Sequence, residues 1–261
     1  MKAIEIMDLL DRWAPPYLID EWDNTGFQIG DPEKQIEKVI ISLDLDREVF
    51  EQAVREKAQM IITHHPIIFK PLKSLTTIDP KERLIYDIIR EGIVVYNAHT
   101  NLDLAKGGVN DALAEALGIV DTEPLAVVHE ETGHGYGRIG KIEETYLSIY
   151  LDKIKKSLDI DHLIIYGSRE KVVGRVAVCG GSGSSFIYDA YLKKADIYIT
   201  GDVKYHEAQY ANELGLTIID AGHYHTEKVI LPVVKDYLEK ELPNKVEMKV
   251  HDQSSPPYVV Y

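Results

Sequence analysis

Short runs of consecutive apolar, mainly β-branched residues alternate along the chain with longer amphipathic stretches. The apolar runs predict buried strands at Val39–Leu43, Met60–Thr63, Ile93–Tyr96, Val172–Val178, Ile197–Thr200 and Leu216–Ile219. The amphipathic stretches predict helices at Arg47–Lys57, Lys81–Glu91, Ser185–Lys194 and Tyr205–Leu214. This alternation is typical of an α/β protein with mixed, mostly parallel sheets flanked by helices.

The pattern occurs twice. A run at Val39-Ile40-Ile41, a helix, and the segment Lys57–Thr63 are matched by Val176-Ala177-Val178, a helix, and Lys194–Thr200, with the same offset from first valine to last threonine. Each copy then passes through another helix into a further apolar run. We predict two similar α/β domains that arose by internal duplication. Coincidence between similar βαβ units is the alternative interpretation.

Between the two copies, Leu125–Gly140 is richer in glycine and histidine. We therefore predict a first domain over residues 1–125 and a second over residues 126–229. A strand-like run at Lys245–Val250 leads us to expect residues 230–261 to complete the first domain.

Composition and charge narrow the class of protein. With 261 residues, of which 45% are hydrophobic and 28% charged, the chain has the composition of an ordinary globular protein. The net charge of -14 argues against binding to nucleic acid or to an anionic membrane. No apolar stretch is long enough for a membrane span, and acidic Glu5 comes too early for a secretory signal, so we expect a cytoplasmic protein. Cys179 is the only cysteine, which leaves nitrogen and oxygen ligands for any metal ion.

Two adjacent histidines, His64 and His65, end the apolar run that begins at Met60. Neighbouring side chains on an extended chain point to opposite faces, so both imidazoles reach a single ion only if the backbone kinks. They suit two ions about 3.5–4 Å apart better, which is the spacing of two-metal hydrolytic sites.

Three further residues follow strands in the same way. Asp103 comes after the strand Ile93–Tyr96, where a turn or helix-capping role is the alternative. His223 and Glu227 are four positions apart and share one face of a helix, as an exposed helical pair also would. Together with the dihistidine, this set suits two divalent ions per chain, such as Zn, Fe or Mn, with Glu227 able to bridge them. Such a centre is positively charged and would attract phosphate or polarise a carbonyl.

Five motifs in this order extend the pattern over nearly the whole chain: Glu21-Trp22-Asp23-Asn24-Thr25-Gly26-Phe27-Gln28-Ile29-Gly30, Thr63-His64-His65-Pro66, Asn97-His99-Asn101-Asp103, Gly201-Asp202-Lys204-His206-Glu207 and Gly222-His223-Glu227. Together they resemble the Nif-three-like dinuclear metal family, often described as GTP cyclohydrolase 1 type 2 homologues, in its short form without an inserted domain.

The resemblance implies a fold, a site and an assembly. The implied metal ligands are His64, His65, Asp103, His223 and Glu227, with Glu227 as the bridge. The implied architecture is a pair of related α/β domains with the metal site between them, assembled as a toroidal homohexamer whose metal centres face the inner cavity.

The remaining motif residues allow two interpretations each. Asp23 and Asn24 suit a tight turn with Trp22 as a core residue, or a substrate contact. The third and fourth motifs supply four further polar residues, which we expect either beside the metal ligands or at the substrate: His99, Asp202, Lys204 and His206.

The leading functional hypothesis is a metal-dependent hydrolase acting on a small molecule or nucleotide. If the family description holds, the reaction opens the imidazole ring of the guanine in GTP, releasing formate and giving dihydroneopterin triphosphate. His206 or His99 would shuttle the proton, and Lys204 and Lys228 would meet phosphates. The alternatives are a two-metal phosphoesterase, or a non-catalytic ring-shaped metal carrier or scaffold.

Overall fold

The computed structural model describes residues 1–251 and 256–258, and the chain divides into two compact units. The first unit comprises Met1–Leu102 and Leu231–Ser254, of which residues 231–251 are described. Its five-stranded sheet has the order β1 (Gly26–Ile29), β4 (Val94–Asn97), β3 (Met60–Thr63), β2 (Lys38–Ser42) and β11 (Glu247–Val250). β1 pairs antiparallel with β4, and the other neighbours are parallel.

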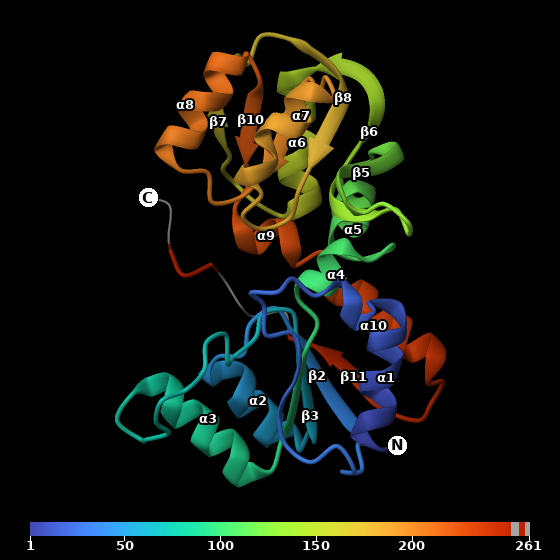
Figure 1. The fold of residues 1–261 in the computed structure, drawn as a ribbon, viewed down its shortest axis with the longest axis vertical. Coiled ribbons are helices and arrows are strands. Elements are labelled where there is room, and N and C mark those ends of the chain that lie inside the picture. Colours follow the sequence, from blue (N-terminus) through green and yellow to red (C-terminus); the bar gives the residue numbers. More distant parts are fainter. Residues whose placement is uncertain (252–255, 259–261) are drawn as a thin grey trace. The chain divides into compact units, whose positions relative to one another are not determined.

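Helices cover both faces of this sheet (Figure 1). On one face, α2 (Arg47–Glu56) and α3 (Pro80–Glu91) pack into a core with β2, β3 and β4. On the other lie α1 (Ala3–Trp13) and α10 (Ile230–Glu241), which are joined by the Trp13 and Tyr237 rings at 4.6 Å between centroids. Because both faces are covered, β3 and β4 are buried along their whole length and β2 is buried except at Lys38, so these strands are mainly apolar runs.

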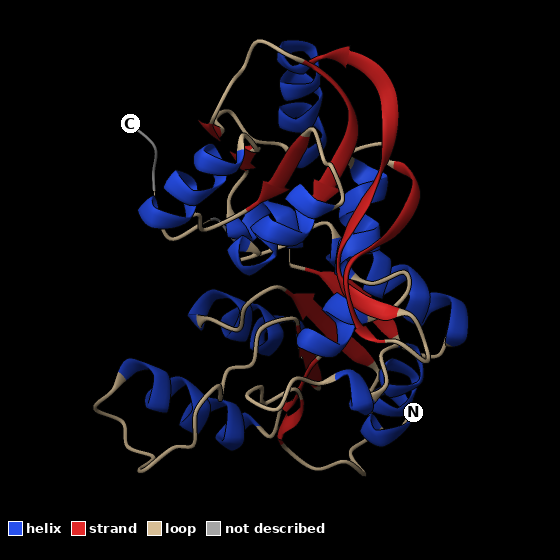
Figure 2. Ribbon diagram, turned by 45° about the horizontal axis from the view of Figure 1, so that its top comes forward, coloured by secondary structure: helices blue, strands red, loops and turns tan. Residues whose placement is uncertain are grey.

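The second unit contains Asp103–Ile230 and a six-stranded sheet. Its order is β5 (Val120–His129), β6 (His134–Tyr146), β8 (Val172–Val178), β9 (Ile197–Thr200), β10 (Thr217–Asp220) and β7 (Ile164–Tyr166). β8, β9 and β10 are parallel, while the β5–β6 hairpin and β7 run antiparallel to their neighbours. The hairpin strands are the long curved arrows in Figure 2.

Alternate residues of the parallel strands face two different cores. Val176 and Val178 pack with α5 (Val109–Ala116) and α6 (Leu147–Leu158), whereas Ala177 packs with α7 (Ile187–Leu192) and α8 (Tyr205–Leu214). Ile197, Ile199 and Tyr198 divide in the same way. This is the two-residue period of a strand buried on both faces.

The predicted α/β class is confirmed, and each of the six predicted strands forms within one residue of its predicted ends. The two copies of the repeated pattern also fold alike. In the first unit β2, α2, β3, α3 and β4 form a parallel βαβαβ segment, and β8, α7, β9, α8 and β10 form another in the second unit.

The chain divides earlier than residue 125. Leu125–Gly140, which the sequence suggested as the change between domains, lies within the β5–β6 hairpin of the second sheet. The second unit begins at Asp103 because α5 buries Leu113 and Leu117 in that unit's core. Among the residues described, no helix has the length and apolar character needed to cross a bilayer.

A buried ion pair fastens this hairpin to α5. The Arg138 guanidinium donates from Nε and Nη2 to the two carboxylate oxygens of Asp111, at 2.5 and 2.8 Å. Its Nη1 donates to the carbonyls of Gly135 and Gly137, at 3.0 and 2.7 Å. Only 4% of Arg138 is exposed, so the hydrogen bonds of its guanidinium replace those it makes with water.

We predict that Arg138→Leu lowers the free energy of unfolding by about 3 kcal/mol, because it removes one partner of a largely buried pair and two backbone contacts. Urea unfolding measures this change. The control is Lys141→Leu, whose partner Asp121 is exposed, and a loss below about 1 kcal/mol is expected there. Equal losses in the two variants would contradict the role of the buried pair.

Candidate metal centre

The backbone turns sharply where β3 ends in the first unit. The backbone N–H groups of His64 and His65 both donate to the carbonyl of Leu43, at 3.2 and 2.9 Å, and the Thr63 hydroxyl donates to the carbonyl of His65 at 2.8 Å. This turn breaks the strand alternation that would send the two imidazoles to opposite faces. Their ring centroids lie 5.0 Å apart, so both contribute to one site.

A third imidazole joins them from the end of β4. The His99 ring lies 5.2 Å from the His64 ring and 5.5 Å from the His65 ring, centroid to centroid. One nitrogen from each of the three rings lies within 4.8 Å of the others, which is a group able to hold a metal ion. The sequence predicted His99 as a candidate proton shuttle. In the structure its ring also lies beside two predicted metal ligands, His64 and His65.

Hydrogen bonds at Nδ1 orient the dihistidine. His64 Nδ1 lies 2.8 Å from the carbonyl oxygen of Ala98, which can only accept, so Nδ1 carries the proton and Nε2 the lone pair of the neutral ring. His65 Nδ1 lies 2.8 Å from Asp44 Oδ1. A backbone carbonyl or carboxylate at the second ring nitrogen is the usual outer partner of a metal-bound histidine.

Asp44 was not among the predicted site residues. It follows β2 as the dihistidine follows β3, and the parallel pairing of these strands brings their carboxyl ends to one edge of the sheet. That shared edge was the available indication of its role.

Asp23 holds His99 in the same manner. Its Oδ1 lies 2.9 Å from His99 Nδ1, and its Oδ2 accepts from the hydroxyls of Thr25 and Thr100 at 2.5 and 2.7 Å. Burial raises the pKa of Asp23, but the hydrogen bonds from His99, Thr25 and Thr100 outweigh it and hold the pKa below its ordinary value. Asp23 is therefore an ionised anchor. Trp22 beside it is 60% exposed, so of the two interpretations of this motif the one with Trp22 in the core does not hold.

In the second unit, His223 and Glu227 form the two ends of α9 (His223–Glu227), as their spacing predicted. His223 Nε2 lies 3.0 Å from Glu227 Oε2, and its Nδ1 lies 2.7 Å from Asp202 Oδ2. Glu227 is only 4% exposed, which an exposed helical pair would not be. Asp202, expected either beside the metal ligands or at the substrate, is thus the hydrogen-bonding partner that orients His223.

The glycines after β8 make room for this carboxylate. A Cβ on Gly181 would overlap Glu227 Oε1 and lie 3.2 Å from His223 Nε2, and a Cβ on Gly180 would lie 3.4 Å from Glu227 Cγ. Gly181 also has a φ of +65°, which a side chain disfavours. The sequence did not identify these glycines, and their place after a strand of the repeated segment was the available indication.

Asp103 is tied to the same glycine loop. The Asn110 amide donates to the Asp103 carbonyl at 3.0 Å and accepts from the Gly180 N–H at 3.0 Å. Burial raises the pKa of the Cys179 thiol, and the nearby carboxylates of Asp103 and Glu227 raise it further. The thiol therefore stays protonated in this structure, and the second unit offers carboxylate and imidazole ligands.

His206 lies apart from these groups. It is exposed on α8, and its Nδ1 lies 2.9 Å from Gln209 Oε1 on the same helix. Within residues 1–251 and 256–258, no group of histidines and carboxylates able to hold an ion includes His206. The structure therefore brings His99, but not His206, to a predicted metal ligand.

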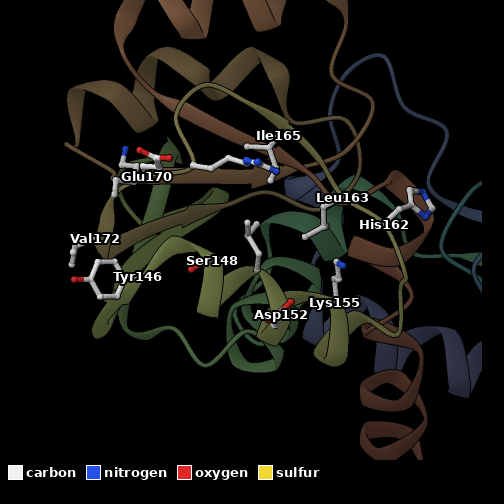
Figure 3. A pocket seen from close by; sticks show the side chains of 12 residues that line it. Tyr146, Ser148, Asp152, Lys155, His162, Leu163, Ile165, Glu170 and Val172 are labelled. Carbon is white, nitrogen blue, oxygen red and sulfur yellow. The ribbon is translucent and has the colours of Figure 1, made fainter.

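A cavity of about 990 Å³ also opens in the second unit, beside α6 and β7 (Figure 3). Leu163 and Ile165 line it together with Asp152, Lys155 and His162. The described residues that line the cavity include none of the predicted metal ligands or proton shuttles.

Residues 1–257 match the family described as Duf34/NIF3 (NGG1p interacting factor 3). The chain belongs to this family. The resemblance drawn from the five motifs is thereby confirmed.

Relatives with high similarity are described as GTP cyclohydrolase 1 type 2 homologues. The Lactococcus lactis protein is 39% identical over 241 residues, covering 91% of each chain. The Methanocaldococcus jannaschii protein is 35% identical over 244 residues, covering 93% of this chain and 96% of its own.

Solved structures agree in fold. A Bacillus cereus protein related to NIF3 has a TM-score of 0.95 and 29% identity, with 100% of this chain and 99% of the other covered. Reduced HcgD from Methanocaldococcus jannaschii has a TM-score of 0.84 and 34% identity, with 97% and 98% covered.

We predict that Gly181→Ala displaces the Glu227 carboxylate and reduces the metal content of reconstituted protein at least tenfold, on the order expected when a metal site is perturbed. Elemental analysis measures it. The matched control is Gly133→Ala, where φ is +69° but no atom lies within 4 Å of the added Cβ. Both variants place a side chain at a similar positive φ, so the backbone strain is comparable. Equal metal content in the two variants would contradict the role of Gly181 in accommodating the Glu227 carboxylate.

Proposed function

We propose that the chain is a dinuclear metal-dependent hydrolase. The proposed ligands are those of the sequence prediction: His64, His65, Asp103, His223 and Glu227. The observation that carries the proposal is the set of orienting hydrogen bonds at Nδ1 of each histidine. In both units the ligands follow strands of the repeated βαβαβ segment, at the edge where α/β proteins bind ligands.

The donor atoms fit divalent ions. Imidazole nitrogen and carboxylate oxygen suit Zn, Fe and Mn, and the availability of each metal in the cell decides among them. Both nitrogens of His223 face carboxylates, so the ring needs a proton on each nitrogen to donate to both Asp202 and Glu227. A metal ion held by His223 and Glu227 would take the place of the proton at Nε2. Glu227 would hold the ions together with His223, and its two carboxylate oxygens are compatible with the bridging role of the sequence prediction.

When bound, two such ions supply Lewis acidity and a water nucleophile activated near neutral pH. The protein's own contribution is to move the proton. The ionised Asp23 at His99 Nδ1 orients the ring and favours the tautomer with its N–H at Nδ1, as the carboxylate of a catalytic triad does for its histidine. We assign the proton transfer to His99, whose ring lies beside the His65 ring, and retain exposed His206 as the second candidate.

GTP is the proposed substrate, because the curated relatives are described as GTP cyclohydrolase 1 type 2 homologues. The reaction would open the imidazole ring of guanine, release formate and give dihydroneopterin triphosphate. The toroidal homohexamer implied by the family resemblance is part of this proposal. A metal carrier with the same ligands is the second candidate, since firmly oriented histidines also favour tight metal retention.

We predict that metal-loaded protein releases formate from GTP, and that His99→Gln lowers kcat at least a hundredfold, the usual contribution of a positioned acid–base group. Glu227→Ala should abolish release together with metal binding. His134→Gln is the control, since His134 lies on β6 and hydrogen-bonds Thr132. Formate is measured by a coupled assay and metal by elemental analysis of each variant.

Retention of two ions without formate release from GTP, and without hydrolysis of phosphoesters, would overturn the hydrolase and leave the metal carrier. Full activity in His99→Gln would show that His99 is not the proton-transfer group.

A further inference from the structure

Two large aromatic side chains stand exposed beside the histidine group of the first unit. Trp22 is 60% exposed and Phe69 40%, and their ring centroids lie 6.0 Å apart at an interplanar angle of 56°. Single exposed apolar residues are common, whereas contacting aromatic rings left open to solvent are typical of a binding surface.

The loops that carry these rings are tied together. The Asn24 side chain donates to the carbonyl of Ile68 at 2.5 Å, and the Ile68 N–H donates to Gln28 Oε1 at 3.1 Å. Gln28 Nε2 in turn donates to the Asn24 carbonyl at 2.7 Å. Trp22 and Phe69 each lie within two residues of this network. Rings held in place before binding lose little conformational entropy when a ligand arrives.

The aromatic pair is joined directly to His99. The Trp22 ring meets the His99 ring edge to face, with centroids 6.1 Å apart and an angle of 84°. Asp23, the next residue in the chain, is the hydrogen-bonding partner of His99 Nδ1. Trp22 therefore contacts both Phe69 and the group to which we assign proton transfer.

We propose that Trp22 and Phe69 are a stacking platform for the planar base of a purine-type substrate, and that they position the base beside His99. This inference rests on the proposed function and names the part of the substrate that the first unit recognises. Indole and phenyl faces offer stacking and apolar contact, which suit a flat heterocycle and do not suit a bare phosphate chain.

The two tryptophans of the chain allow a direct test of binding. In a Trp13→Phe background, Trp22 is the only tryptophan, and its fluorescence reports on the platform alone. We expect saturable quenching by guanosine and by GTP, in metal-free as well as metal-loaded protein, and none by tripolyphosphate. Quenching by tripolyphosphate equal to that by guanosine would overturn the stacking role.

Substitution supplies the second arm, with guanosine binding measured by calorimetry. Trp22→Leu should weaken binding about tenfold or more, and Trp22→Phe should restore it to within about threefold, because a flat ring returns. The matched control is Tyr188→Leu, which removes one ring of another exposed stacked pair, with Tyr191. Unchanged guanosine binding in Trp22→Leu overturns the proposal, and a changed assembly state with unchanged binding would instead assign the rings to contact between copies.

The platform and the proposed function fail in distinguishable ways. Guanosine binding that depends on Trp22, without formate release from GTP, sustains the platform and rejects the hydrolase. Formate release with the same kcat and KM in Trp22→Leu sustains the hydrolase and rejects the platform. The metal content of Trp22→Leu is expected to equal that of the unmodified protein.

Discussion

The candidate centre depends on one kind of contact, a fixed oxygen at Nδ1 of each histidine. His64 is held by a backbone carbonyl, and His65, His99 and His223 are held by carboxylates. The contact fixes how each ring is turned and directs Nε2 away from its anchor. It also explains why the surrounding acidic residues matter although they are not predicted ligands. Without these anchors, each imidazole would rotate about its χ angles and the donor set would be lost to side-chain entropy.

Both units place these contacts with the same local arrangement of strands and helices. In each unit a parallel βαβαβ segment delivers its polar residues directly after the strands, where side chains from separate parts of the sequence meet at one edge. The two copies have diverged at that edge. The first offers imidazoles on a kinked backbone after β3, and the second offers a carboxylate that the glycine at position 181 accommodates. Differences in loop residues on a common scaffold therefore produce two different sets of polar side chains.

Sequence reasoning succeeded where local pattern determines structure. Buried parallel strands are continuous apolar runs, so their limits could be predicted closely, and the repeat located the polar residues that follow them. It failed where tertiary contact decides. The glycines and histidines of Leu125–Gly140 suggested a change between domains, yet Arg138 and the pairing of β6 with β8 place this segment inside a sheet. The role of Asp44 arises only when β2 and β3 pair, and the exposure of Trp22 cannot be read from its apolar character.

The most direct test of the central claim is the electron paramagnetic resonance spectrum of the protein loaded with manganese, because ions about 3.5–4 Å apart in a two-metal site couple magnetically. The account predicts two Mn²⁺ per chain with an exchange-coupled spectrum. That spectrum should be lost in His65→Ala, from the first unit, and equally in His223→Ala, from the second. Isolated six-line Mn²⁺ signals, with each variant losing only one ion, would contradict the proposed dinuclear centre.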